Sequence, residues 1–158
     1  MKLACVGTGY VGLVNGAVFG EMGNNVLCMD IDSERIARLN RGEMPIFENC
    51  LEELVRKNVS AGRLSFSAIL DGAVDFADVL FTCVGTPSLS DGSADLSAVF
   101  DVAQSIGERI VKNNLDYRLI VNKSTVPPGT TDKVYTMLLN LGVSKERFDV
   151  AMNPEFLQ

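Results

Sequence analysis

Short apolar runs alternate along this chain with longer amphipathic segments, and this alternation restricts the fold more than any other feature of the sequence. The apolar runs are typical of buried β-strands, whereas the segments between them carry the periodicity of helices. Strands that alternate with helices favour right-handed β-α-β units, in which parallel strands are covered on both faces. We therefore predict an α/β fold, a doubly wound parallel sheet of about six strands.

The predicted elements account for most of the chain. Strands are predicted at residues 2–6, 25–30, 78–84, 117–122 and 149–152, with a weaker candidate at 64–66. Helices are predicted at residues 10–22, 33–40, 50–60, 96–112 and 130–141. Ser33 and Asp95 have the features of helix N-terminal caps. Because no linker, repeat or low-complexity tract interrupts the pattern, residues 1–158 are predicted to form one domain.

Charge and composition exclude several classes of function. The net charge is −6 and no run of Lys or Arg forms a basic patch, so neither nucleic acid nor an anionic membrane is an expected partner. The chain has no His, which removes the commonest metal ligand and the usual acid–base group at neutral pH. Cys5, Cys28, Cys50 and Cys83 show no CxxC spacing, so we expect no metal site and no disulfide framework.

The N-terminal segment gives an expectation about location. It enters a strand pattern at once, without the apolar region and small-residue cleavage site of a signal peptide. The apolar runs elsewhere are too short to cross a bilayer. We expect a cytoplasmic protein.

Residues 7–12 read Gly-Thr-Gly-Tyr-Val-Gly, a GxGxxG motif directly after the first predicted strand and at the start of a helix. In such a motif Gly7 would allow a tight turn, Gly9 would let the backbone approach a pyrophosphate, and Gly12 would let the helix pack close to the strand. The helix N-terminus would then attract the negative charge. Taken alone, the motif is equally well explained as a glycine-rich turn.

Asp30 strengthens the case for a dinucleotide. It ends the second predicted strand, 18 residues after Gly12, close to the spacing of about 20 expected for an acid that binds the adenosine ribose. A carboxylate there repels a 2′-phosphate and so favours NAD over NADP. Asp30 could instead be a turn or cap residue, and Arg35, which could reach the adenosine, could be a solvated helix residue. The whole constellation indicates a Rossmann-like NAD-binding domain, and a methyltransferase fits it less well because S-adenosylmethionine has no pyrophosphate.

Further motifs follow the later strands. Residues 83–88 read Cys-Val-Gly-Thr-Pro-Ser, residues 122–130 read Asn-Lys-Ser-Thr-Val-Pro-Pro-Gly-Thr, and residues 153–157 read Asn-Pro-Glu-Phe-Leu. Each could be a plain turn or a proline-stiffened loop. Together with residues 7–12 and 39–48, in this order, they make the chain similar to the UDP-glucose/GDP-mannose dehydrogenase family. The resemblance extends over essentially all 158 residues and matches the N-terminal NAD-binding domain of that family.

The resemblance implies a reaction and a set of site residues. Enzymes of this family oxidise the primary alcohol of a nucleotide sugar to a carboxylate with NAD, through a thioester on a cysteine. Thr125 would hold a proton-relaying water, and Glu155 would be the base in thioester hydrolysis. The implied cofactor-binding residues are Gly7, Thr8, Gly9, Tyr10, Val11, Gly12, Asp30, Arg35, Val84, Gly85, Thr86, Pro87, Ser88, Ser124, Thr125 and Val126. The amino-acid sequence of residues 123–130 most resembles that of UDP-glucose enzymes, which favours UDP-glucose as the substrate, with UDP-N-acetylhexosamine and GDP-mannose as alternatives.

The chain departs from the family pattern in two places. Asn49-Cys50 replaces the usual Pro-Gly, so that turn is expected to be built differently, and Gln158 replaces a basic or small residue. Cys50 lies among Glu48, Glu52 and Glu53, which disfavour a thiolate, and we interpret it as structural.

In the family, the catalytic cysteine and its supporting lysine and asparagine belong to later segments, as do the substrate domain and the helical segment that builds the dimer. We therefore expect residues 1–158 alone to be inactive and monomeric, and the full-length protein to be a homodimer. Two other functions remain open: an NAD-binding module without chemistry, and another dehydrogenase on the same scaffold, of the hydroxyacyl-CoA or 6-phosphogluconate type.

Overall fold

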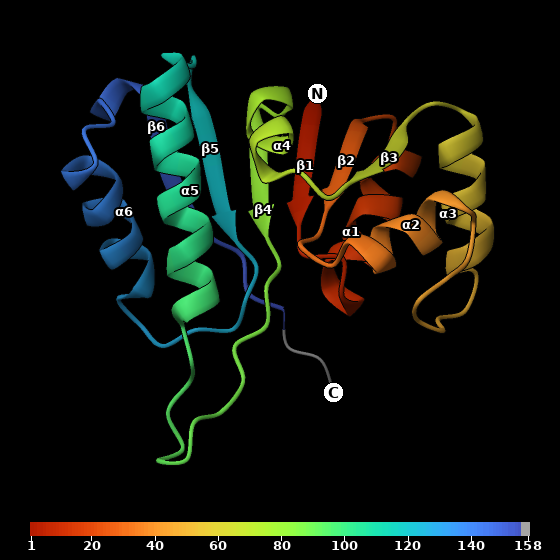
Figure 1. Ribbon diagram of the computed structural model, residues 1–158, viewed down its shortest axis with the longest axis horizontal. Coiled ribbons are helices and arrows are strands. Elements are labelled where there is room, and N and C mark those ends of the chain that lie inside the picture. The colour runs from red at the N-terminus through yellow and green to blue at the C-terminus, as the bar shows by residue number, and fades with distance from the viewer. Residues whose placement is uncertain (156–158) are drawn as a thin grey trace.

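A computed structural model describes residues 1–155 of the chain, which form a six-stranded, wholly parallel sheet (Figure 1). The strand order is β3-β2-β1-β4-β5-β6, so the direction of progression reverses between β1 and β4. The strands are β1 (Lys2–Val6), β2 (Asn25–Met29), β3 (Leu64–Ser67), β4 (Val79–Thr82), β5 (Arg118–Asn122) and β6 (Phe148–Met152). The predicted Rossmann-like fold class is confirmed.

Six helices and one 3₁₀ turn connect the strands. They are α1 (Tyr10–Glu21), α2 (Ser33–Asn40), α3 (Leu51–Ser60), α4 (Leu70–Phe76), α5 (Ser97–Asn113), α6 (Thr130–Asn140) and η1 (Lys145–Arg147). The apolar side chains form two core clusters: one joins the sheet to α1, α2 and α3, and the other joins it to α4, α5 and α6. The sheet is therefore covered by a different set of helices on each face.

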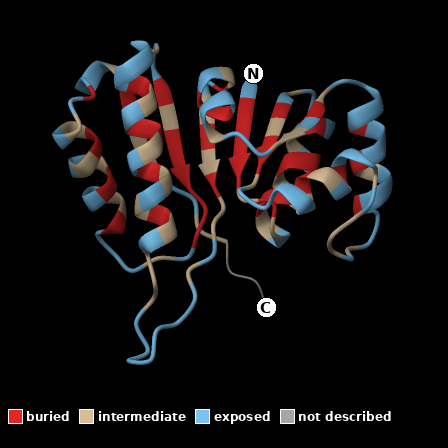
Figure 2. Cartoon of the chain, viewed as in Figure 1, coloured by how far each residue is buried: buried red, intermediate tan, exposed pale blue. Residues whose placement is uncertain are grey.

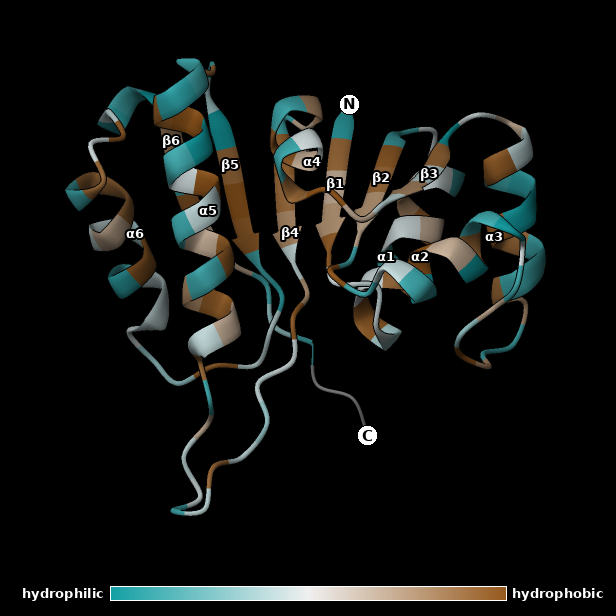
Figure 3. Cartoon of the chain, viewed as in Figure 1, coloured by the Kyte–Doolittle hydropathy of each residue, from teal (hydrophilic) through white to brown (hydrophobic). Residues whose placement is uncertain are grey.

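The apolar content of the strands explains why they occupy the centre of the molecule. Leu3, Ala4, Cys5 and Val6 of β1 are all buried, as expected for a parallel strand with both faces covered. In Figure 2 the buried positions run along the strands and the inner sides of the helices, and Figure 3 shows the same positions as the hydrophobic ones. Within the described part of the chain, no helix combines the length and the apolar character needed to cross a membrane.

The structure differs from the sequence-based expectations at a few points. The helix α4 was not among the predicted elements, because its seven residues are too few to display a helical period and include Gly72. The cap of α2 is Asp32, whose side chain accepts hydrogen bonds from the backbone N–H groups of Glu34 and Arg35, and the predicted cap Ser33 is the first helical residue instead. Asp95 does accept a hydrogen bond from the N–H of Ser97, the first residue of α5, although its own backbone lies one residue before the cap position.

The carboxyl ends of the strands lie along one edge of the sheet, at the bottom of Figure 1. In open α/β sheets this edge binds ligands, most often where the strand order reverses. The loops that follow β1, β2, β4, β5 and β6 carry the motifs singled out in the sequence, and all of them therefore reach the same edge.

Candidate functional site

The turn between β1 and α1 is built on three glycines with different surroundings. Gly7 has a φ of +101° and its N–H donates to the carbonyl of Met29 at 2.7 Å. A Cβ atom on Gly12 would lie 1.8 Å from the carbonyl oxygen of Gly7, so only glycine allows α1 to pack this close. A Cβ on Gly9 would meet no protein atom within 4 Å. The turn is therefore tight on its inner side and open at Gly9.

Asp30 is joined to this turn by hydrogen bonds. One of its carboxylate oxygens accepts from the backbone N–H of Thr8 at 2.7 Å and from the Thr8 hydroxyl at 2.8 Å, and Thr8 itself is fully buried. The Arg35 guanidinium lies 3.6 Å from this same oxygen, and the other oxygen accepts from the N–H of Asp32 at 3.0 Å. Burial opposes ionisation of Asp30, but the hydrogen bonds from Asp32 and Thr8 and the charge of Arg35 outweigh it and lower the pKa of the carboxyl.

A largely apolar cavity of about 400 Å³ opens beside Asp30. Gly7 and Asp30 form one side of it, and Ile31, Leu70, Val84 and Val102 contribute apolar side chains. Ile31 is 90% exposed, which is unusual for an isoleucine. Of these four apolar residues only Val84 was among the candidates from the sequence. Ile31 lies between two aspartates directly after a strand, where an apolar residue is unexpected. That position is the one sequence feature that could have pointed to an apolar cavity here.

A second cavity, of about 500 Å³, lies on the other side of the β1–α1 turn. It brings together residues from four segments that are far apart in the sequence: Gly9, Tyr10, Val11, Cys83, Val84, Gly85, Thr86, Lys123, Ser124, Thr125 and Glu155. The loops after β4 and β5 are fastened to each other here. Thr86 donates through its hydroxyl to the carbonyl of Thr125 at 2.9 Å, and Ser124 donates to the carbonyl of Val84 at 2.7 Å.

Glu155 is one of the residues that line this cavity, and its carboxylate contacts two neighbouring side chains. Its carboxylate accepts from the Lys123 ammonium at 2.9 Å and from the Asn15 amide at 3.2 Å. The pKa of Glu155 is lowered, first by Lys123 and then by Asn15. Thr125 donates through its hydroxyl to the backbone carbonyl of Glu155 at 3.2 Å. Thr125 and Glu155 are thus brought together, whereas Lys123 and Asn15 were not among the candidates from the sequence.

Three further candidate residues lie outside these two cavities. Pro87 and Ser88 belong to a loop of residues 85–96 that extends beyond the strand edge in Figure 1. A bridge between Ser88 and Ala94 gives this loop the form of a short hairpin. Val126 lines a separate cavity of about 360 Å³ with Thr125 and Met152. Phe156 and Leu157 of the last motif, and Gln158, lie outside the described residues.

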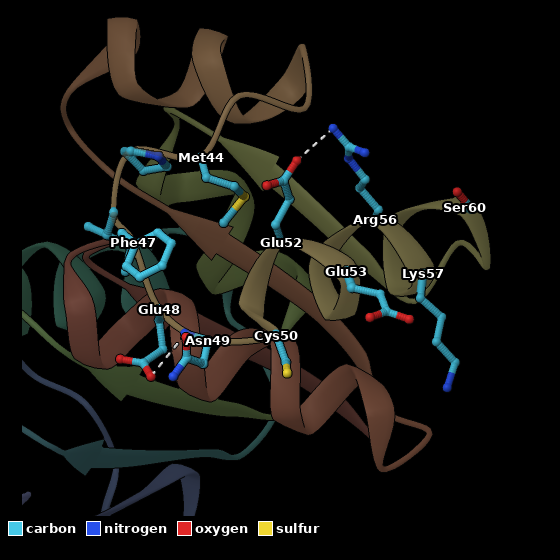
Figure 4. Close-up of a pocket in the computed structure, with 12 residues that line it drawn as sticks. Met44, Phe47, Glu48, Asn49, Cys50, Glu52, Glu53, Arg56, Lys57 and Ser60 are labelled. Carbon is cyan, nitrogen blue, oxygen red and sulfur yellow. Dashed lines mark hydrogen bonds and ion pairs between the residues drawn. The ribbon is translucent and has the colours of Figure 1, made fainter.

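A larger cavity, of about 1030 Å³, is lined by side chains from residues 44–60 (Figure 4). It shares no lining residue with the two cavities described above. Cys50 lies on its wall with Glu48, Glu52 and Glu53 nearby, and its backbone is in the left-handed region, with a φ of +63°. The cysteine therefore occupies a backbone conformation that glycine adopts without strain.

Two of the other three cysteines are paired across the sheet, Cys5 of β1 with Cys28 of β2, and Cys83 directly follows β4. Cys5 and Cys28 are buried, and Cys83 is partly exposed. Contact with Cys5 and burial together raise the pKa of the Cys83 thiol above its usual range. Cys50 is the exposed cysteine of the four.

Comparison with known proteins gives consistent relationships. A sequence profile for the "UDP-glucose/GDP-mannose dehydrogenase family, NAD binding domain" matches residues 1–158. The UDP-glucose 6-dehydrogenase of Pseudomonas aeruginosa is 48% identical and covers 100% of this chain, which spans 35% of that protein. TuaD of Bacillus subtilis, a UDP-glucose 6-dehydrogenase, is 45% identical over 99% of this chain and 33% of its own length. The chain thus spans about a third of the curated relatives that it matches.

Solved structures agree with the sequence matches. A UDP-glucose dehydrogenase from Pyrobaculum islandicum superposes with a TM-score of 0.91 at 40% identity, covering 99% of this chain and 36% of its own. A GDP-mannose dehydrogenase from Pseudomonas aeruginosa, solved as a ternary complex, gives a TM-score of 0.94 at 36% identity, with 100% and 37% covered.

Proposed function

The chain belongs to the UDP-glucose/GDP-mannose dehydrogenase family, and from this membership we propose that it is the NAD-binding part of a nucleotide-sugar dehydrogenase. The observation that carries the proposal is the pair of hydrogen bonds that Thr8 donates to the Asp30 carboxylate. It fixes an acid at the end of β2 beside a glycine turn that is open at Gly9, and that turn lies between two cavities.

The two cavities fit the two ends of a dinucleotide. In this proposal the apolar cavity lined by Ile31, Leu70 and Val102 takes the adenine, and Asp30 accepts hydrogen bonds from the adenosine ribose. The pyrophosphate lies against Gly9 and the N-terminus of α1, where backbone N–H groups and the helix dipole favour negative charge. The nicotinamide end enters the second cavity, along residues 84–86 and 124–126. Bound NAD supplies the hydride acceptor for alcohol oxidation.

Thr125 and Glu155 are proposed as the catalytic residues that this chain contributes. The low pKa of Glu155 keeps its carboxylate charged near neutral pH, so that it can accept a proton from water. Thr125 is next to it and can orient that water through its hydroxyl. UDP-glucose is the proposed substrate, since the Pseudomonas aeruginosa and Bacillus subtilis relatives, at 48% and 45% identity, are named UDP-glucose 6-dehydrogenases.

The remaining features of the proposal concern the whole protein. We propose that residues 1–158 are one domain, that the substrate-binding residues and the catalytic cysteine lie in the segments found in the longer relatives, and that the full-length protein is a homodimer in the cytoplasm. The four free thiols are consistent with a reducing compartment.

Calorimetric titration of the 158-residue chain with NAD and with NADP tests the cofactor assignment. NAD should bind more tightly, because the Asp30 carboxylate repels a 2′-phosphate. Asp30→Ala should weaken NAD binding by roughly tenfold or more, through loss of hydrogen bonds to a charged acceptor, and should relax the preference because Arg35 is freed. Asp116→Ala, on an exposed loop, is the matched control. NADP binding as tight as NAD binding in the unaltered chain would contradict the assignment.

A further inference from the structure

Lys123 is buried at a position where a lysine needs a partner. Only 8% of the residue is exposed, and it follows β5 directly. Its ammonium lies 2.9 Å from the Glu155 carboxylate and 3.1 Å from the side-chain oxygen of Asn153. Lysines are almost never buried to this extent unless they are paired. The pair with Glu155 therefore accounts for the position of Lys123 in the fold.

The surroundings of the pair indicate what it does. Gly9, Tyr10 and Val11, at the start of α1, line the same cavity as Lys123 and Glu155. The proposed function places the pyrophosphate, which carries two negative charges, against Gly9 at the edge of this cavity, with the nicotinamide end inside it. An uncompensated carboxylate in the cavity would repel the pyrophosphate, because like charges near a partly desolvated site interact strongly.

We propose that Lys123 is a positioning and charge-compensating residue, which holds the Glu155 carboxylate in place and neutralises it so that an acidic side chain and an anionic cofactor can occupy one cavity. The inference rests on the proposed function, since it takes the anion to be NAD. It assigns to Lys123 a role in cofactor affinity in addition to any role in folding.

Asn15 provides the second contact to Glu155. Its amide donates at 3.2 Å to the same carboxylate oxygen that Lys123 contacts, and at 2.7 Å to the carbonyl of Val11, one turn earlier in α1. Cys83, at the end of β4, also faces this cavity, and its raised pKa keeps the thiol neutral. Among the described residues that line the cavity, Lys123 is the one that supplies a positive charge.

A double-mutant cycle on the 158-residue chain tests the proposal, with NAD affinity measured by calorimetry. Lys123→Met should weaken NAD binding roughly three- to tenfold, because it leaves Glu155 uncompensated. Glu155→Gln should tighten binding, and the double substitution should return the affinity to within about twofold of the unaltered chain. Lys123→Arg keeps the charge and should retain the affinity. Lys133→Met, on the exposed side of α6, is the matched control.

Two outcomes of the cycle would overturn the proposal. Unchanged affinity in Lys123→Met would mean that Glu155 does not repel the cofactor. A loss that Glu155→Gln leaves uncorrected would mean that Lys123 does not act through Glu155, and urea unfolding of each variant would show whether that loss comes from reduced stability.

A second measurement separates this inference from the proposed function. The carboxyl carbon of Glu155 can be titrated by NMR without any cofactor. Its midpoint should rise in Lys123→Met and remain low in Lys123→Arg, because the ammonium stabilises the charged form. If NAD fails to bind the unaltered chain, the proposed function fails, and the titration still decides whether Lys123 controls Glu155. An unchanged midpoint in Lys123→Met would refute the inference even if NAD binds.

Discussion

The hydrogen bonds of Asp30 make its contribution to stability dependent on pH. Burial disfavours its charge, but the N–H groups of Asp32 and Thr8 and the Arg35 guanidinium lower the pKa of the carboxyl below its unfolded value. A group with a lowered folded pKa stabilises the protein above its unfolded pKa, about 3.9 for Asp, and loses that contribution as the pH falls through the folded pKa.

Asp30→Asn should therefore lower the free energy of unfolding at pH 7, and the difference from the unaltered chain should shrink below about pH 4. Urea unfolding at a series of pH values measures this. Asp116→Asn, on an exposed loop, should show a much smaller dependence. A difference that stays constant down to pH 2 would mean that the Asp30 charge does not contribute.

Cys50 is strained by its backbone, and its replacement by glycine should relieve that strain. A left-handed conformation costs a non-glycine residue roughly 1–2 kcal/mol, whereas glycine adds roughly 0.4–1 kcal/mol of chain entropy to the unfolded state. Cys50→Gly should thus raise the free energy of unfolding by up to about 1 kcal/mol. Asn49→Gly, at a neighbour without positive φ, should lower it. A loss of stability in Cys50→Gly would show that the turn depends on the cysteine side chain.

The sequence identified those candidate residues whose structural roles are local. Gly7, Gly12 and Asp30 are recognisable because a strand, a tight turn and a helix require them at fixed spacing. Lys123, Asn15 and Ile31 could not be found in this way. Their contacts depend on which distant strand ends lie side by side, and Asn15 meets Glu155 across 140 positions of the sequence.

At the scale of the element, the start of α1 contains two glycines that have different structural roles, although the motif alone does not distinguish them. A Cβ on Gly12 would collide with the backbone of Gly7, whereas a Cβ on Gly9 would enter open space, and Gly9 has a φ of −69° that alanine also adopts. Gly12 is therefore required for packing, and Gly9 is required only where a ligand approaches.

Gly12→Ala should lower the free energy of unfolding by roughly 2 kcal/mol or more, because an overpacked backbone contact must be relieved by moving α1. Gly9→Ala should keep nearly the full stability but lose most of its NAD affinity. Unfolding and calorimetry on both variants provide the comparison, and Gly72→Ala, whose Cβ also meets nothing, is the control. Equal loss of stability in the two motif variants would contradict this division.

The elements differ in how well the sequence predicted them. Five helices and six strands were expected within two residues of their bounds, because each carries an apolar period or run of sufficient length. The helix α4 was missed because it is short, and its place in the core through Ala73 and Val74 becomes evident only from packing. Alternation predicted parallel strands, but the order of the strands follows from how the crossovers fold back on the sheet.

At the scale of the whole molecule, binding and catalysis should be separable. The resemblance places the nucleophilic cysteine in later segments, and the chain's own cysteines do not replace it. Cys5 and Cys28 are buried, the thiol of Cys83 has a raised pKa, and Cys50 lines a cavity that is distinct from those at the strand edge.

The 158-residue chain should consequently bind NAD and form no NADH when UDP-glucose is added. Catalytic residues that act as a unit lose nearly all activity when one essential member is missing. NADH absorbance measures the outcome, with the Pseudomonas aeruginosa UDP-glucose 6-dehydrogenase as the positive control. Turnover by the chain alone at a rate near that of the control would refute the division of the active site between two parts of the protein.

The hydrogen bonds between Thr8 in the glycine turn and Asp30 also affect the conformational entropy of ligand binding. Thr8 is buried and makes two hydrogen bonds to Asp30, and Gly7 donates a hydrogen bond to Met29 of the neighbouring strand. A loop that must become ordered on binding loses affinity to that ordering, whereas a preorganised loop does not. We therefore expect the glycine turn to change little when a dinucleotide binds, so that most of the conformational freedom lost on binding is that of the dinucleotide.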